Sequence, residues 1–190
     1  YTLDDYRRRY AQYRTDGDLQ AAHHRHPFIV IWDDHELSDD TWENGLGDIN
    51  YKGEFSERKL AALQAYFEWM PIRPVTENDH LKIYRQFDFG SLVKLSMLDT
   101  RIIARSQQLK YSNYLSSNIL DVTRIKRDLN NNSRTILGLE QRKWLENQII
   151  QSNATWHVLG QQVLMTKMMV PGELSSILVD FVKPPFSLSK

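Results

Sequence analysis

The spacing of hydrophobic positions along the chain predicts a series of amphipathic helices. The first begins after Thr2, which forms a capping-box pattern with Asp5 and precedes tyrosines at helical spacing. The clearest helix ends before Pro71, because proline lacks the backbone N–H of the next helical hydrogen bond. Its inward face is predicted to carry Leu60, Leu63, Phe67 and Met70. The predicted helices are residues 3–14, 19–24, 56–70, 138–152 and 173–182.

Four segments have the patterns of strands. Residues 28–31 and 156–160 are continuous apolar runs and are predicted to be buried strands. Residues 83–89 and 92–98 alternate apolar and polar positions on either side of a Gly-Ser turn, which predicts a hairpin. Residues 106–134 are polar and poorly periodic, and we interpret them as an insertion loop. This order of elements predicts an α/β fold with a mixed sheet.

Composition restricts the class of protein. The chain has 190 residues, of which 41% are hydrophobic and 25% charged, which is typical of one globular domain or a portion of one. Lys+Arg and Asp+Glu both number 24, and this zero formal net charge argues against a general nucleic-acid or anionic-membrane binder. No apolar run approaches the roughly 18 residues of a membrane span, and no signal peptide is visible. The absence of cysteine excludes disulfides and thiolate metal ligands.

The most informative chemistry follows the first apolar run. Asp33, Asp34 and His35 come directly after residues 28–32, at a place where α/β folds build their sites. Carboxylates suit hard cations, and an imidazole can transfer protons near neutral pH. The alternative interpretation is a polar turn in which Asp33 caps the next segment, and the bare motif leaves both open.

We consider two further groups of residues that would support this motif. Asp39 and Asp40 offer oxygen ligands in the following loop, although the usual polarity of surface loops favours a solvated loop. Asp99 ends the second arm of the hairpin and precedes Arg101, a pattern that favours a structural ion pair over a role beside a bound phosphate.

The stretch around the motif resembles a known enzyme family. The string from residue 27 to residue 36, Pro-Phe-Ile-Val-Ile-Trp-Asp-Asp-His-Glu, followed by Asp-Thr-Trp at 40–42, is similar to the PhoD-like alkaline phosphatases of the calcineurin-like metallophosphatase superfamily. Further strings resemble the same family in the same order and extend the resemblance over nearly the whole chain. They lie at residues 1–7, 58–71, 84–90, 97–101, 137–145 and 156–163.

The resemblance implies a metal-dependent hydrolase of phosphate monoesters and diesters. It implies a β-sandwich of mixed sheets flanked by helices, a site with iron and calcium, and an extracellular, periplasmic or cell-surface location. The comparable superfamily motif is Gly-Asn-His-Glu or Gly-Asn-His-Asp. By that match Asp34 is a metal ligand, His35 lies beside the leaving group, and Asp33 is a carboxylate at or next to the metal. We therefore interpret Asp39, Asp40, Asp99 and Arg101 as residues that support the metal site from its surroundings.

The chain also departs from the family pattern, and these departures indicate how much of the site it carries. The superfamily site also needs an early Asp motif, a Gly-Asp motif and late histidine motifs, and PhoD-like enzymes use a cysteine ligand. This chain has no cysteine and no histidine beyond residue 157. The resemblance therefore implies an internal portion of a catalytic domain that carries part of the site and is inactive alone. The alternative is a truncated or degenerate domain that acts as a scaffold or interaction module.

Overall fold

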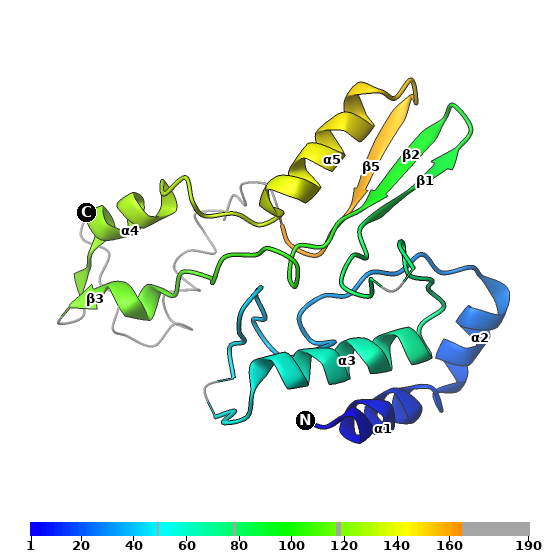
Figure 1. Ribbon diagram of the computed structural model, residues 1–190, viewed down its shortest axis with the longest axis horizontal. Coiled ribbons are helices and arrows are strands. Elements are labelled where there is room, and N and C mark those ends of the chain that lie inside the picture. Colours follow the sequence, from blue (N-terminus) through cyan, green and yellow to red (C-terminus); the bar gives the residue numbers. More distant parts are fainter. Residues whose placement is uncertain (49, 78, 117–118, 165–190) are drawn as a thin grey trace, which may run out of the picture. The chain divides into compact units, whose positions relative to one another are not determined.

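The computed structural model describes residues 1–48, 50–77, 79–116 and 119–164 (Figure 1). The chain divides into two compact units, one of residues 1–107 with 135–162 and one of residues 108–134 with 163–190. The helix expected at residues 173–182 lies outside the described residues. None of the described helices is both long enough and apolar enough to cross a bilayer.

The first unit contains four of the predicted helices, and local sequence explains where they begin. They are α1 (Leu3–Tyr13), α2 (Gly17–Arg25), α3 (Phe55–Trp69) and α5 (Gly138–Ile150). The capping box before α1 is confirmed, since the Thr2 side chain accepts a hydrogen bond from the Asp5 backbone and the Asp5 side chain accepts one from Thr2. Asp16 caps α2 by accepting a hydrogen bond from the Leu19 N–H at 2.7 Å.

The main core lies between α3, α1 and the loop that follows residue 31. Its fully buried members are Trp32, Leu37, Ala62, Leu63, Tyr66, Ile83 and Ile102. The indole of Trp32 meets the ring of Tyr66 edge-on, with centroids 5.4 Å apart. Leu60 is 64% exposed, so its predicted inward position is wrong; the buried face of α3 is rotated towards Ala62 and Tyr66.

A small mixed sheet forms the second part of this unit. Strands β1 (Arg85–Phe89) and β2 (Val93–Met97) pair antiparallel, and β5 (Trp156–Gly160) pairs parallel with β2. The predicted hairpin is confirmed, and Gly90 supplies its turn with a φ of +58°. The crossover from β2 to β5 contains α5, as parallel pairing requires. The predicted α/β class is therefore confirmed, and the mixed sheet has the strand order β1-β2-β5 within the described residues.

One face of the sheet remains apolar and exposed. The register places Phe89, Val93 and Trp156 in one row across the strands. Phe89 is 52% and Trp156 63% exposed, so the strand predicted at 156–160 is present but its predicted burial is wrong. In Figure 1, α5 lies beside β5. The inward face of α5 carries Gln141 and Leu145, whereas Leu139 and Ile149, which would continue an apolar stripe, are exposed.

The predicted strand at residues 28–31 is absent from the structure. The segment is extended without a neighbouring strand, and both Phe28 and Ile29 are 36% exposed. Side chains take the hydrogen bonds that a sheet would provide. Arg85 Nη2 donates to the Val30 carbonyl at 2.5 Å, and Gln162 Nε2 donates to the Trp32 carbonyl at 2.7 Å.

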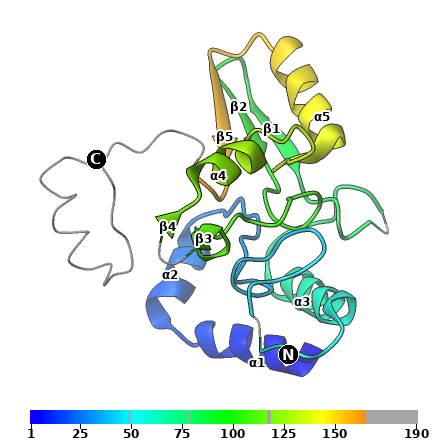
Figure 2. The same cartoon turned by 90° about the vertical axis from the view of Figure 1, so that its left-hand side faces the viewer.

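The second unit has short elements of its own. They are a 3-10 turn η1 (Tyr111–Tyr114), the paired strands β3 (Leu115–Ser116) and β4 (Ile119–Leu120), and helix α4 (Val122–Leu129). Figure 2 labels β3, β4 and α4. Asp121 caps α4 through the Arg124 N–H at 2.9 Å. The interpretation of residues 106–134 as an insertion loop stays a prediction, and the structure adds that the segment contains secondary structure.

We expect Gln141→Leu to destabilise the first unit strongly. Gln141 is 1% exposed; its Oε1 accepts from the Asp99 N–H at 2.8 Å and its Nε2 donates to the Asp99 carbonyl at 2.7 Å. The leucine leaves both backbone groups buried without partners, which should lower the free energy of unfolding by about 2–3 kcal/mol. Urea denaturation measures the loss. The exposed Asn147→Leu on the same helix is the control, and equal midpoints for the two variants would contradict the prediction.

Candidate metal centre

A tight loop follows Trp32 and carries the candidate residues. The Asp34 carbonyl accepts hydrogen bonds from Leu37 N at 2.9 Å and Ser38 N at 2.7 Å, which turns the chain back on itself. The Asp34 side chain accepts a third bond, from Asp40 N at 2.8 Å. Asp40 closes the loop with a φ of 51°, a left-handed conformation that aspartate tolerates better than most residues. The loop therefore withdraws the Asp34 carboxylate from water, leaving the residue 8% exposed.

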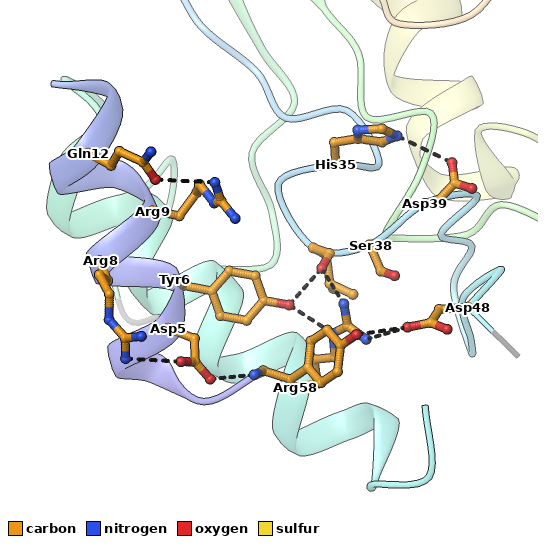
Figure 3. A pocket seen from close by; sticks show the side chains of 12 residues that line it. Asp5, Tyr6, Arg8, Arg9, Gln12, His35, Ser38, Asp39, Asp48 and Arg58 are labelled. Atoms are coloured by element: carbon orange, nitrogen blue, oxygen red, sulfur yellow. Dashed lines mark hydrogen bonds and ion pairs between the residues drawn. The ribbon is translucent and has the colours of Figure 1, made fainter. Parts of the chain in front are cut away.

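Three potential metal ligands meet on this loop. Asp34, His35 and Asp39 each offer one ligand atom, and these atoms lie within 4.8 Å of one another. His35 Nε2 lies 3.2 Å from Asp39 Oδ1, and Figure 3 shows the imidazole directed towards that carboxylate. Asp34 is the buried member, whereas the side chains of His35 and Asp39 are 77% and 74% exposed. Within the described part of the chain this is the one group of three or more such side chains.

Arg101 brings the loop to the end of β2. Its Nε lies 2.5 Å from Asp33 Oδ1 and its Nη1 lies 3.7 Å from Asp34 Oδ2. The Arg101 side chain is 11% exposed and that of Asp33 is 45% exposed, so only the arginine side of this ion pair is shielded from water. The predicted ion pair between Asp99 and Arg101 is therefore wrong. Asp99 accepts the backbone N–H of Arg101 instead, at 2.8 Å, while the guanidinium turns to the motif.

Asp99 lies behind the motif and is fully buried. Its Oδ1 accepts the N–H groups of Arg101 and Ile102, and its Oδ2 has no hydrogen-bond partner among the described residues. Burial raises the pKa of this carboxyl, because desolvation disfavours the charged form more than the two backbone donors, the Trp32 indole and the Lys59 charge favour it. Asp99 therefore anchors the turn after β2 and does not belong to the three-ligand group.

Sequence reasoning missed the glutamine that ties the motif to the sheet. Gln162 Nε2 donates to the carbonyls of both Trp32, at 2.7 Å, and Leu98, at 2.8 Å. Its Oε1 accepts from the Thr100 hydroxyl at 2.5 Å. The Gln162 amide thus joins its own segment to residue 32 and to residues 98–100, and residue 32 directly precedes the candidate site. The Gln-Gln string at 161–162 was part of the family resemblance, but nothing in its local pattern indicated a role.

Two further arginines near the loop were also missed. Arg105 Nη1 donates to the Thr100 carbonyl at 3.2 Å, and burial lowers the pKa of the Arg105 guanidinium while the carboxylates of Asp33, Asp40 and Asp34 oppose that shift. Its spacing of four residues from Arg101, just after a strand, was the available signal. These contacts give the acidic loop a second cationic neighbour.

Arg58 is the other missed arginine, and it clamps the far end of the loop. Its Nη2 donates to the Leu37 carbonyl at 3.2 Å, and the Tyr6 hydroxyl donates to the same carbonyl at 2.6 Å (Figure 3). Arg58 Nε also donates to the Tyr6 hydroxyl at 2.9 Å. Helices α1 and α3 together hold the residue that follows the motif. The clamp therefore restrains the backbone on which His35 is carried.

The donor set fits a metal ion that accepts oxygen and nitrogen ligands. Two carboxylates and an imidazole suit iron and similar cations, and carboxylates also suit calcium. The three side chains supply fewer ligands than the 6–8 oxygens typical of calcium. Asp33 lies beside the group, but Arg101 engages its carboxylate. Asp40 contributes its backbone N–H to Asp34, and that bond orients the buried ligand.

Comparison with known proteins identifies relatives. The sequence model of the family described as PhoD-like phosphatase matches residues 1–180. Alkaline phosphatase D of Bacillus subtilis (strain 168) is 39% identical over 172 residues, which is 87% of this chain and 27% of that protein. A solved structure of PhoD is similar with a TM-score of 0.69 at 39% identity, and the match covers 87% of this chain and 30% of the solved one. The chain thus spans less than a third of the length of these relatives.

We expect Asp99→Asn to change how stability depends on pH. Because the pKa of Asp99 is raised in the folded protein, its stabilising contribution is complete below the unfolded pKa of about 3.9 and is lost as pH rises through the folded pKa. Asparagine does not titrate, so the variant should gain stability relative to the parent as pH rises. Urea midpoints of both proteins across the acidic and neutral range measure this. A stability difference that is independent of pH would refute the assignment.

Proposed function

The chain belongs to the PhoD-like phosphatase family, and on that premise we propose that it contributes part of the site for metal-dependent hydrolysis of phosphate monoesters and diesters. The observation that carries the proposal is the meeting of Asp34, His35 and Asp39 on one loop, with Arg101 beside them. Carboxylates to hold cations, an imidazole to move a proton and a guanidinium beside them are the groups that phosphoester hydrolysis needs.

Asp34 is the residue that we propose as the principal metal ligand of this chain, with Asp33 as a further carboxylate beside it. Asp34 is buried and oriented by Asp40, as a ligand must be before the metal arrives. Bound ions would neutralise the phosphate oxygens and lower the pKa of a coordinated water towards about 7. Iron and calcium are the ions that the family resemblance favours. Asp39 is the added ligand that the geometry supports.

His35 is the residue that we propose as the proton donor to the leaving oxygen. Its imidazole is exposed, so it can reach a substrate that approaches from solvent. Asp39 lies 3.2 Å from His35 Nε2 and can orient the ring. Asp99 and Arg101 support these groups from behind, Asp99 through the turn after β2 and Arg101 through the ion pair with the motif.

The resemblance also supports a location outside the cytoplasm. PhoD-like enzymes are typically exported, so we propose an extracellular, periplasmic or cell-surface site of action on phosphoesters. Substrate and location both concern the whole protein. This chain spans less than a third of the length of the relatives that it matches.

We expect the isolated 190-residue chain to hydrolyse a nitrophenyl phosphate ester negligibly, even with added iron and calcium. The described residues gather only three candidate ligands, too few to hold the metals of such a site. The protein expressed from its complete gene should be active under the same conditions. Release of nitrophenol measures both, and robust metal-dependent turnover by the 190-residue chain would contradict the expectation. Inactivity of the complete protein would favour a scaffold role.

We expect Asp34→Ala and His35→Ala to differ in the complete protein. Asp34→Ala should lower metal content and activity together, because it removes the buried ligand. His35→Ala should retain metal and lower turnover by roughly 10²–10⁴-fold, the usual contribution of a general acid. Its loss should be smaller for nitrophenyl esters, whose leaving group needs little protonation, than for alkyl esters.

Metal analysis and rates on both ester types separate these roles. The exposed His24→Ala on α2 is the matched control for loss of an imidazole. Equal losses on both esters for His35→Ala would remove the acid role. Loss of metal in that variant would make His35 a ligand, which its place in the three-residue group also permits.

A further inference from the structure

A pocket opens directly beside the candidate metal centre. It has a volume of about 750 Å³ and is enclosed by α1, the loop at residues 35–39 and the start of α3. His35 and Asp39 lie at one side, and Arg9 and Gln12 of α1 form part of the wall (Figure 3). This volume is in the range of pockets that enclose small molecules. An alcohol that leaves the phosphorus with a proton from His35 would therefore face a cavity lined by α1.

The three arginines that line the pocket differ in how their charges are compensated. Arg8 lies 3.1 Å from the Asp5 carboxylate, and Arg58 Nη1 lies 3.7 Å from Asp48 Oδ2. Arg9 Nη1 instead donates to the neutral amide oxygen of Gln12, at 3.2 Å. Among the described residues, Arg9 is therefore the pocket arginine that has no carboxylate partner. Its charge remains available to an acidic ligand.

Arg58 also lines the pocket, but its guanidinium is already engaged. The residue is 5% exposed, and its Nη1 is buried without a hydrogen-bond partner among the described residues. The rings of Tyr1 and Tyr51 cover the guanidinium, with centroids 3.9 Å and 4.7 Å from its carbon. Asp48 Oδ2, 3.7 Å from Nη1, already compensates the charge of this buried guanidinium, so Arg9 is the pocket arginine that is left for an acidic ligand.

We propose that this pocket binds the alcohol side of the phosphoester and that preferred substrates carry a second acidic group there, held by Arg9. The inference rests on the proposed phosphoesterase function and adds the substrate class to it. The shared chemistry is an oxyanion, either a carboxylate or a second phosphate. Guanidinium groups recognise both through charge-assisted hydrogen bonds.

Three phosphoesters of three-carbon alcohols test the proposal in the protein expressed from its complete gene. They are propyl phosphate, 3-(phosphonooxy)propanoate and propane-1,3-diyl bisphosphate, and phosphate release gives kcat/KM for each. Both acidic substrates should exceed propyl phosphate by about tenfold or more, the effect of one exposed charge-assisted hydrogen bond. The larger of the two ratios identifies carboxylate or phosphate as the natural group.

Variants assign the preference to the pocket. Arg9→Ala should reduce the ratio of acidic to propyl substrate about tenfold. Arg25→Ala, an exposed arginine on α2 outside the pocket, is the matched control and should keep the parent ratio. Thermal unfolding checks that Arg9→Ala, an exposed change on α1, leaves the fold intact.

The possible results separate this inference from the function on which it rests. Turnover of propyl phosphate without preference for either acidic substrate would overturn the inference and leave the phosphoesterase function standing. A preference that survives Arg9→Ala would also overturn it. No phosphate release from any substrate would remove the proposed function, and the inference with it.

Discussion

The ion pair between Arg101 and the adjacent carboxylates of Asp33 and Asp34 is the interaction on which the candidate site depends. Asp33 and Asp34 place two negative charges side by side, and a nearby cation stabilises that arrangement by Coulomb attraction. Arg101 supplies that cation from the end of β2, with its Nε 2.5 Å from Asp33 Oδ1. The pair therefore holds the acidic loop against the sheet and also decides which carboxylate is left for a metal.

Side-chain amides and guanidinium groups make the hydrogen bonds to backbone groups that strand pairing makes in a sheet. The backbone before the motif has no neighbouring strand. Arg85 donates to its Val30 carbonyl instead, and Gln162 donates to its Trp32 carbonyl. Gln141 does the same for both backbone groups of Asp99. Arg58 and Tyr6 hold the Leu37 carbonyl beyond the motif. Each contact joins residues far apart in the chain, so the loop is positioned by the fold as a whole.

Local signals in the sequence predicted most of the secondary structure. The Thr2–Asp5 capping box, the hairpin around Gly90 and the helices α3 and α5 all follow from interactions within a few residues. Burial was predicted less well. Leu60 is apolar but exposed, and Arg58 is charged but buried between two tyrosine rings. Helical periodicity identifies a face, and only the elements packed against the helix decide which face is inside.

The sequence by itself determined the chemistry of the motif, its family and the elements that flank it, because these depend on residue identity and short-range hydrogen bonds. Tertiary structure alone decided the partners. It assigned Arg101 to Asp33 and Asp34 rather than to Asp99, and of the two loop carboxylates that the sequence offered it brought Asp39, and not Asp40, into the candidate metal-ligand group. It also placed Arg9 at the wall of a pocket beside His35. Such pairings join distant segments through geometry that no local spacing encodes, since a side chain's neighbours depend on how the elements pack.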